Sequence, residues 1–513
     1  MAPRVLILGG GPAGVAAAYG LTRAEAAEVE LFERGGALGG NAGSFWSGRQ
    51  WLDFGRHHLD PDGAPEALAA LRAELGRDLV ERPRQGRLRL QGRWLRYPPS
   101  APDLLLHLDR RLALGAGADA FRSAVGRRRG APDDSFAAAM EHRLGRALCE
   151  HLYFPYARKL WGLPPEALSA ALAGPVLSAV GSSAGGAEGA GERGGLRSAL
   201  GSLDRAAVRS ALGSVGRLVQ RAVQPAEEER FLYPREGFGQ LTRALGAAAE
   251  AGGAQVHLRA EVTAVERRDD GWRVELTGPA PGSGAPPANA GEAPRWEAQG
   301  RHLWSTLPLP ILVRAMRPRP PAEVVEAAAR LAYRAVVLVY LELPVDRFHP
   351  ADTHYFPERD IGMARLSEPK NFFGHAAPRG FTTLCAEIPC APGDAVWTTS
   401  DAELGERVRA DLARVELPLP AEPVRVFTRR RRFAHPVYAR GFAAPLGTLR
   451  RWAATQPDLR GLGRQGAFVH ARPHQVLAMG LAAAESLRAE GFDGPGWARR
   501  LAAAGLPDLG AGA

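Results

Sequence analysis

Three features within the first 33 residues predict an α/β fold that begins with a buried parallel strand. Residues 5–8, Val-Leu-Ile-Leu, form a short apolar run with β-branched members, typical of one buried strand. Residues 9–14 carry Gly-x-Gly-x-x-Gly spacing, and residues 15–21 have the composition of a helix. A second strand follows at 29–33 and ends in an acid. This order of strand, glycine loop, helix and acidic strand end is that of a Rossmann-like dinucleotide-binding unit.

The chemistry of a dinucleotide site explains each glycine. Gly9 allows the tight turn, Gly11 leaves the backbone open to a pyrophosphate, and Gly14 lets the helix pack closely on its strand. The helix N-terminus then faces the phosphates, and Glu33 lies where a ribose hydroxyl would be held. The alternatives, a signal peptide or a plain core segment, are disfavoured by the strand–turn–helix order.

Length and composition limit the class of protein. A chain of 513 residues can bury a large core and is expected to hold at least two domains. No window is apolar enough for a transmembrane helix. The three cysteines, Cys149, Cys385 and Cys390, suggest neither a disulfide framework nor a metal site, so we expect reduced thiols and a cytoplasmic location.

The net charge of +10 does not indicate a nucleic-acid partner. Only Lys159 and Lys370 are lysines among the 65 basic residues, and arginine is spread along the whole chain. The runs at 127–129 and 429–432 lack the interleaved aromatic residues of a stacking platform. We expect a small-molecule substrate and no nucleic acid, with peripheral contact to an anionic membrane surface left open.

The remaining pattern alternates between helical and strand-like stretches without repeats. Helices are expected over 64–76, 101–125, 133–153, 196–223 and 401–415, and strands over 255–276, 301–307, 335–343 and 381–388. Residues 181–195 and 278–294 are rich in Gly, Ala and Pro and are expected to be loops, the second at a long hairpin tip.

A second glycine cluster follows the Glu33 strand. Residues 34–41, Arg-Gly-Gly-Ala-Leu-Gly-Gly-Asn, would let backbone amides approach a ligand held by the first loop. The alternative is an ordinary flexible loop. The continuation over 44–55 has the pattern of a hairpin.

These two clusters with Glu33 resemble the N-terminal signature of the FAD-binding amine oxidase and protoporphyrinogen oxidase superfamily. Three other segments, at 231–245, 254–266 and 462–487, are similar to its later cofactor segments. The resemblance implies FAD as cofactor, held in a discontinuous, Rossmann-like FAD-binding domain of the GR2 type, beside a mixed α+β substrate domain. We expect 1–80, 230–310 and 425–513 in the first and 81–229 and 311–424 in the second. The implied cofactor residues are Gly9, Gly11, Pro12, Ala13, Gly14, Glu33, Arg34, Gly39, Gly40, Asn41, Val262, Gly463, His474 and Val476.

Within the superfamily, the chain is most similar to the branch that contains UDP-galactopyranose mutases and protoporphyrinogen-oxidase-like proteins. The similar segments are 38–42, 93–99, 153–169 and the Gly-Arg-x-Gly and His-Gln-Val stretches after residue 462. Two departures concern the mutase activity specifically. Arg472-Pro473 replaces an Asp-Met pair, and no counterpart of the paired phosphate-binding arginines is evident.

A flavin carries the electrons itself, so the protein's task is to place a substrate and exclude water. Aromatic and basic residues near the substrate face are therefore the candidates for substrate binding: Tyr97, Tyr156, Trp161, Arg432 and Tyr438. For each aromatic residue the alternative is a place in the core. His57, His58 and Lys159 are the candidates for catalysis, with a structural histidine and a structural ion pair as the respective alternatives.

The sequence therefore predicts an FAD-dependent oxidoreductase that takes hydride from a small or medium organic substrate. The alternative is a non-oxidative, flavin-dependent sugar-nucleotide mutase, and a third option is a flavoprotein without catalysis. No Ser-His-Asp or Cys-His arrangement points to hydrolysis.

Overall fold

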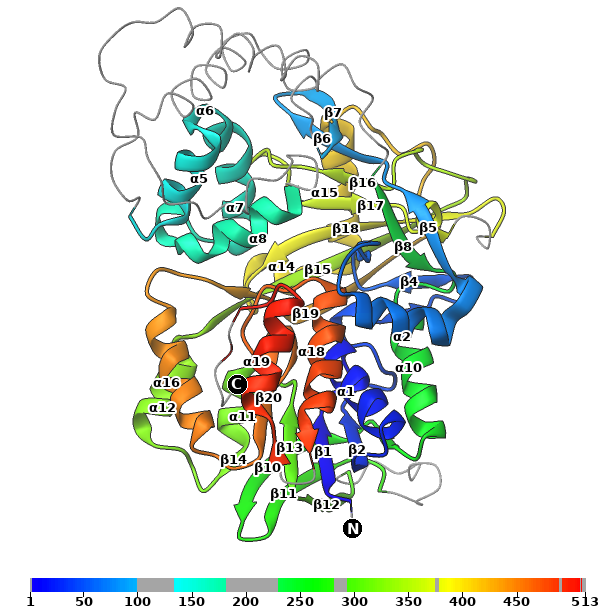
Figure 1. Ribbon diagram of the computed structural model, residues 1–513. Coiled ribbons are helices and arrows are strands. Elements are labelled where there is room, and N and C mark those ends of the chain that lie inside the picture. Colours follow the sequence, from blue (N-terminus) through cyan, green and yellow to red (C-terminus); the bar gives the residue numbers. More distant parts are fainter. Residues whose placement is uncertain are drawn as a thin grey trace, which may run out of the picture.

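The computed structural model describes residues 2–98, 133–180, 229–280, 293–373, 378–488, 491–507 and 509. Its lower half in Figure 1 is built on a five-stranded parallel sheet with strand order β20-β13-β1-β2-β9. The strands are β1 (Arg4–Leu8), β2 (Glu28–Glu33), β9 (Gln255–Leu258), β13 (His302–Ser305) and β20 (Leu459–Gly461). Three distant parts of the chain thus share one sheet, which confirms the predicted fold class.

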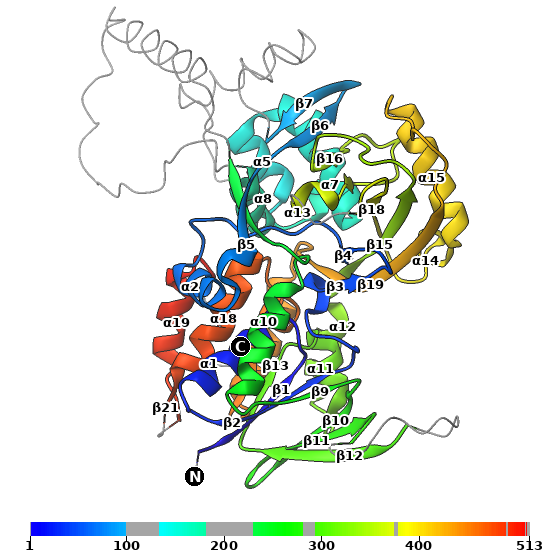
Figure 2. The same cartoon turned by 90° about the vertical axis from the view of Figure 1, so that its right-hand side faces the viewer.

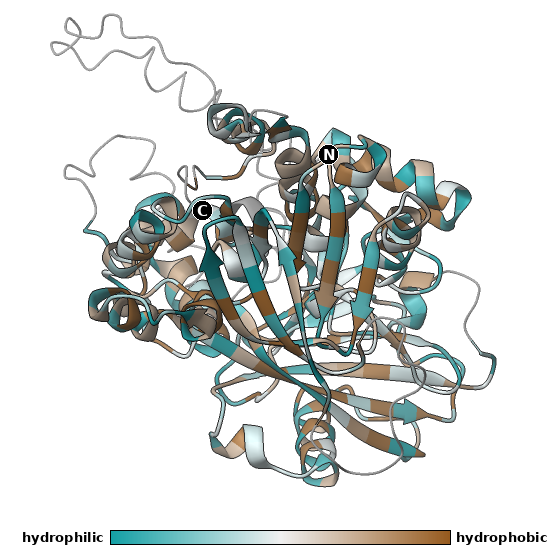
Figure 3. Ribbon diagram, turned by 90° about the horizontal axis from the view of Figure 1, so that it is seen from below, coloured by the Kyte–Doolittle hydropathy of each residue, from teal (hydrophilic) through white to brown (hydrophobic). Residues whose placement is uncertain are grey.

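Both faces of β1 are buried, which explains its unbroken apolar sequence. Val5 and Ile7 pack with the helix α1 (Pro12–Arg23) and its neighbours, whereas Leu6 and Leu8 pack with a second sheet. The α1 helix lies beside α10 (Gln240–Ala251) and α18 (Pro473–Ser486) on the first face. Figure 3 shows apolar residues along the strands that lie between these helices and the second sheet.

The second sheet has four strands in the order β12-β11-β10-β14. Their bounds are β10 (Glu261–Arg268), β11 (Gly271–Thr277), β12 (Arg295–Gly300) and β14 (Met316–Arg317). Trp272 and Val274 of β11 are fully buried against the parallel sheet. The lower half is therefore three layers deep: helices, parallel sheet and four-stranded sheet (Figure 2).

The upper half carries a seven-stranded sheet in the order β19-β15-β18-β17-β16-β6-β7. The strands are β6 (Gly86–Leu90), β7 (Arg93–Tyr97), β15 (Ala332–Leu343), β16 (Thr353–Tyr355), β17 (Arg365–Ser367), β18 (Thr382–Cys390) and β19 (Arg425–Val437). β19 pairs with β15 from Arg425 to Val437. Residues 425–437 of the expected cofactor segment 425–513 therefore lie in this sheet and not in the five-stranded sheet.

Helices cover both faces of this sheet. The main ones are α5 (Phe136–Leu144), α7 (Phe154–Trp161), α8 (Ala173–Val180) and α15 (Asp401–Arg414), with a helical turn at Cys149–Tyr153 between α5 and α7. Below them, α11 (Leu309–Ala315), α12 (Ala322–Arg330) and α16 (Ala443–Ala454) form a second group (Figure 1). α19 (Gly494–Ala503) packs on α18.

Most predicted elements have counterparts in these bounds. The helix expected over 64–76 is α2 (Pro65–Leu75), and the hairpin after the second glycine cluster is β3 (Ser44–Trp46) with β4 (Trp51–Asp53). The helix expected over 133–153 is broken into α5, a short turn and a wider helical turn. The expectations for 101–125, 181–195 and 196–223, and for most of 278–294, lie outside the described residues.

Candidate functional site

A cavity of about 1580 Å³ extends from the carboxyl ends of β1 and β2 to the helices of the upper half. It is larger than the 300–1,000 Å³ typical of sites for one drug-sized ligand. Its walls come from both glycine clusters, the β10 start, β19, and the segment 463–476. Its size and shape suit a dinucleotide and a second molecule together.

The first glycine loop forms one end of this cavity. Gly9, Gly11, Pro12 and Ala13 line it, and α1 begins at Pro12 with its N-terminus toward the space. A Cβ added at Gly11 would meet no protein atom within 4 Å. Gly14 does not line the cavity; its Cβ would lie 2.1 Å from the Gly9 carbonyl oxygen. Gly11 thus leaves room for a ligand, and Gly14 permits close packing.

Glu33 connects the two glycine clusters. Its carboxylate accepts hydrogen bonds from the Gly10 N–H at 2.8 Å and the Gly35 N–H at 2.6 Å. The Gly39 N–H donates to the Gly10 carbonyl at 2.8 Å, with Gly39 at a φ of 122° that favours glycine. Arg34, Gly40 and Asn41 line the cavity.

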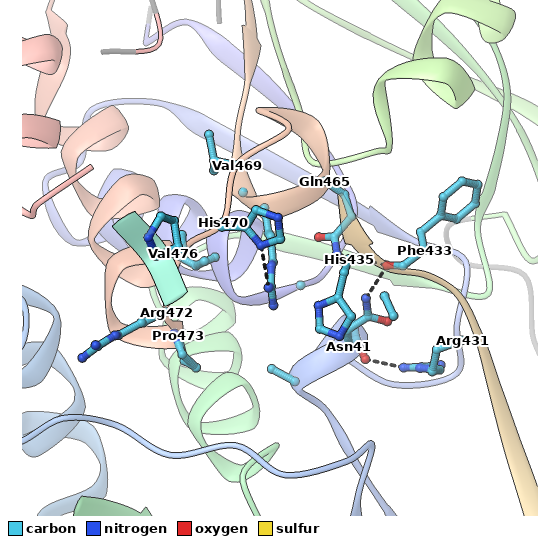
Figure 4. Close-up of a pocket in the computed structure, with 18 of the residues that line it drawn as sticks. Asn41, Arg431, Phe433, His435, Gln465, Val469, His470, Arg472, Pro473 and Val476 are labelled. Atoms are coloured by element: carbon cyan, nitrogen blue, oxygen red, sulfur yellow. Dashed lines mark hydrogen bonds between the residues drawn. The ribbon is translucent and has the colours of Figure 1, made fainter. Parts of the chain in front are cut away.

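The C-terminal segment closes the same space from the other side. Gly463 approaches Ala13, where an added Cβ would lie 3.2 Å from the Ala13 Cβ. His474 and Val476, in the first turn of α18, line the cavity, as does Val262 of β10. Figure 4 shows Asn41, Phe433, His435, Gln465 and His470 around one space, with the Asn41 amide donating to the Phe433 carbonyl at 2.7 Å.

The five aromatic and basic residues expected at the substrate also line the cavity: Tyr97, Tyr156, Trp161, Arg432 and Tyr438. Tyr438 is fixed by its own contacts, since its hydroxyl donates to the Phe468 carbonyl at 3.1 Å and its ring stacks on Phe442. Tyr97 stacks on Tyr355 with ring centroids 3.9 Å apart. Trp161 contacts His470 edge-on and Phe136 at a tilt of 60°.

The two adjacent histidines differ in how their nitrogens are used. His57 Nε2 lies 3.0 Å from the Asn41 carbonyl oxygen and 3.1 Å from that of Phe54, so this nitrogen carries the proton. His58 accepts from Arg56 at Nδ1 and faces Asp60 with Nε2 at 3.5 Å. Both line the cavity, but only His57 keeps a ring nitrogen without a described partner.

Lys159 takes a structural position instead of the catalytic one expected. Its ammonium donates to the carbonyl oxygens of Phe356, Glu358 and Met363 at 2.6, 2.7 and 3.1 Å. These three bonds use all of its N–H donors. Lys159 is not among the cavity-lining residues, and it ties α7 to the 356–363 loop. The alternative expected for Lys159 was a structural ion pair, whereas its hydrogen-bond acceptors are backbone carbonyl oxygens.

Sequence reasoning missed several residues in the cavity wall. Arg365 pairs with the buried carboxylate of Glu387, with Nε 3.0 Å from Oε2, and Arg56 is almost fully buried. His435 and Arg464 also line the cavity. Arg464 belongs to the Gly-Arg-x-Gly stretch noted after residue 462, and His435 lies between the candidates Arg432 and Tyr438. Arg365 and Glu387 lie inside β17 and β18, and no motif marks them.

Within the described part of the chain, no group of His, Cys, Asp and Glu residues is arranged to hold a metal ion. The described helices include none long and apolar enough to cross a membrane. All three cysteines are buried as free thiols.

The fold and the cavity are those of a flavoprotein. The model of the family "flavin containing amine oxidoreductase" matches residues 12–469, and the chain belongs to this family. Membership makes it a flavoenzyme of the oxidoreductase class, with FAD as its cofactor. The open space at Gly11, the Glu33 carboxylate and the two helix N-termini fit FAD.

Solved structures of the superfamily share this architecture. A reduced UDP-galactopyranose mutase has a TM-score of 0.75 at 17% identity, over 99% of this chain and 98% of that one. A protoporphyrinogen oxidase-type protein from Exiguobacterium sp. 255-15 has 0.68 at 19%, over 95% and 98%. Putrescine oxidase bound to putrescine has 0.57 at 19%, over 94% and 98%. At these identities the likeness establishes the fold. No curated protein matches the chain.

The contrast between Gly11 and Gly14 gives a first prediction. Gly11→Val should leave the stability of the apoprotein unchanged, because the added carbons enter open space, and should abolish FAD binding. Gly14→Ala, the matched control, should lower the melting temperature of the apoprotein, because its Cβ collides with the Gly9 carbonyl. Flavin absorbance per protein and thermal unfolding measure both. A Gly11→Val protein with stoichiometric FAD would contradict the assignment.

Acid should destabilise the protein below pH 6.5. Burial lowers the pKa of His57 to about 4 and the pKa values of His58 and His470 to about 3. Between these values and 6.5 the unfolded chain binds more protons, so each histidine removes up to about 1.4 kcal/mol of stability per pH unit as the pH falls. Asp53 opposes this between about 6 and 4, because burial raises its pKa to about 6.

Urea midpoints between pH 8 and pH 5 measure this balance, and the three histidines outweigh the single aspartate. His470→Gln should flatten the profile, whereas His142→Gln, at an exposed position of α5, should not. A midpoint that stays constant or rises toward pH 5 would rule out neutral, buried histidines in the cavity wall.

Lys159→Met should destabilise the fold by about 2–3 kcal/mol, because three carbonyl oxygens lose a charged donor. FAD bound per folded molecule should not change, since Lys159 lies outside the cavity wall. Denaturant unfolding and flavin absorbance are the measurements. A variant of unchanged stability with a turnover lowered about tenfold would restore the catalytic assignment.

Proposed function

We propose that this chain oxidises a small or medium organic substrate by hydride transfer to FAD, with oxygen or another acceptor reoxidising the flavin. The observation that carries the proposal is the continuity of the cavity. It extends from the Gly11 and Glu33 end to a wall of tyrosines and arginines in the upper half. A substrate held there would share one cavity with the cofactor.

When bound, FAD supplies the two-electron chemistry. The residues of the chain then have three tasks: to bind the cofactor, to orient the substrate and to move a proton. Asn41 and Gln465 both donate to the Phe433 carbonyl, and Arg431 donates to the Gly40 carbonyl. These bonds fix β19 against the second glycine cluster and shape the cavity between them.

His57 is the better candidate for proton transfer of the two histidines. Its Nε2–H is held by two carbonyl oxygens, so Nδ1 is the unprotonated nitrogen and can accept a proton. His58 already accepts from Arg56 at Nδ1. His58 therefore serves as a positioning residue that orients Arg56.

A redox-neutral rearrangement, as in the mutase neighbour, is a second candidate. The observation that favours it is the positive charge of the buried Arg56 and the part-buried Arg464, which suits an anionic substrate. In that case the flavin would have to be reduced beforehand and would return to the same state after each turnover.

Anaerobic mixing of the oxidised holoenzyme with carboxylates, amines, porphyrinogens, polyenes and UDP-sugars distinguishes the two candidates. The proposal predicts flavin bleaching with one of these classes and recovery of colour on adding an acceptor. His57→Gln should slow flavin reduction by about tenfold or more, and His58→Gln should slow it less. Turnover seen only after prior reduction with dithionite would favour the rearrangement instead.

A further inference from the structure

The substrate side of the cavity contains a buried guanidinium without a carboxylate partner. Arg56 is only 7% exposed and lines the cavity. Its Nη1 lies 3.0 Å from His58 Nδ1, and its Nε is buried with no hydrogen-bond partner. Its backbone N–H donates to Glu387, but the Glu387 side chain forms its ion pair with Arg365.

Two arginines close to Arg56 are paired with carboxylates, whereas Arg464, farther along the wall, contacts only His470 Nδ1 at 3.4 Å among the described polar side chains. Arg84 pairs with Glu229 at 2.8 Å, and Arg365 pairs with Glu387. Arg56 therefore adds one positive charge that the described side chains do not balance. Burying such a charge costs several kcal/mol unless an anion compensates it.

Two tyrosines provide further donors at this place. Tyr97 and Tyr355 are stacked, and the Arg84 guanidinium lies 5.7 Å from the Tyr97 ring centre. Neither hydroxyl has a hydrogen-bond partner in the described part of the chain. Burial raises the pKa of Tyr97 to about 12, against the opposing charges of Arg84, Arg56 and Arg365. The Tyr97 hydroxyl therefore keeps its proton at neutral pH and can donate a hydrogen bond. The charge of Arg56 is among those that lower its pKa.

The helices of the upper half supply an apolar wall to the same cavity. Phe136 of α5, Leu152 of the following turn, Leu160 of α7 and Leu172 before α8 line it, with Leu446 of α16. A ligand that reaches both the arginine and these side chains must be charged at one end and apolar along its body. A primary ammonium would instead meet uncompensated positive charge.

We propose that the substrate is an organic monocarboxylate, bound with its carboxylate on Arg56 and the Tyr97 and Tyr355 hydroxyls and its apolar body along the helical wall. The inference rests on the proposed function, because it takes the molecule in this cavity to be the one that the flavin oxidises. A carboxylate would balance the charge of Arg56, and its two oxygens match the fork of N–H donors.

Binding to the oxidised holoenzyme tests this without turnover. Isothermal titration should give octanoate a Kd lower than that of octan-1-ol or octylamine by about 10- to 100-fold. Affinity should rise by about fourfold for each methylene from butyrate to octanoate. Arg56→Met should remove the preference for octanoate over octan-1-ol, and Arg56→Lys should keep part of it. Arg96→Met, the same change at an exposed position of β7 outside the cavity, should not alter it.

Three results would overturn the inference: octylamine binding as tightly as octanoate, a preference that survives Arg56→Met, or uridine diphosphate binding more tightly than octanoate and depending on Arg56. The last would make the ligand a phosphate ester. Flavin bleaching is read separately. Carboxylate binding through Arg56 with no bleaching by any substrate would leave this site standing and refute the proposed function. Bleaching by an amine with no carboxylate binding would refute this site and leave the proposed function standing.

Discussion

The close packing of α1 on α18 is the constraint on which the site depends. A Cβ at Gly480 of α18 would lie 2.3 Å from the Ala13 carbonyl oxygen and 2.8 Å from the Ala17 nitrogen. At Gly20 of α1 it would lie 2.7 Å from Ala484. The two helices can approach this closely only because small residues face each other. As a result, the first turns of both helices line one cavity, and their positive ends favour the negative charge of a pyrophosphate there.

The substrate side depends on a different kind of contact, a buried network around Glu387. This carboxylate, on the seven-stranded sheet, accepts the Arg56 N–H from the segment after β4 and pairs with Arg365 of β17. It thereby joins the cofactor half of the molecule to the upper sheet at the place where the cavity passes between them. Loss of one partner of a buried ion pair strongly destabilises a fold, because it leaves the other charge buried without compensation.

The cofactor side can be predicted from a local pattern, whereas the buried charged residues of the substrate side cannot, and the reason is physical. Gly9, Gly11, Gly14 and Glu33 act within one short strand–turn–helix unit, so their spacing alone is informative. Arg56, Arg365 and Glu387 come together only through sheet pairing between segments that are far apart. Lys159 looked chemically distinctive because lysine is rare in this chain, yet its neighbours are backbone carbonyls, which no side-chain pattern can indicate. Likewise, the composition of β19 does not indicate which sheet this strand joins. Its pairing with β15 places it in the seven-stranded sheet.

The shared wall of α1 and α18 has a consequence for biosynthesis. The Gly11 loop precedes α18 in the chain, so it is made well before that helix. During translation the early strands can fold, but the pocket lacks one side until Gly480 reaches Ala13. The two-sided flavin pocket therefore forms only after α18 has been made. In a nascent chain stalled before residue 473, the flavin pocket would lack its α18 wall and would hold no flavin. The apolar face of α1 that α18 covers would then be accessible to chaperones.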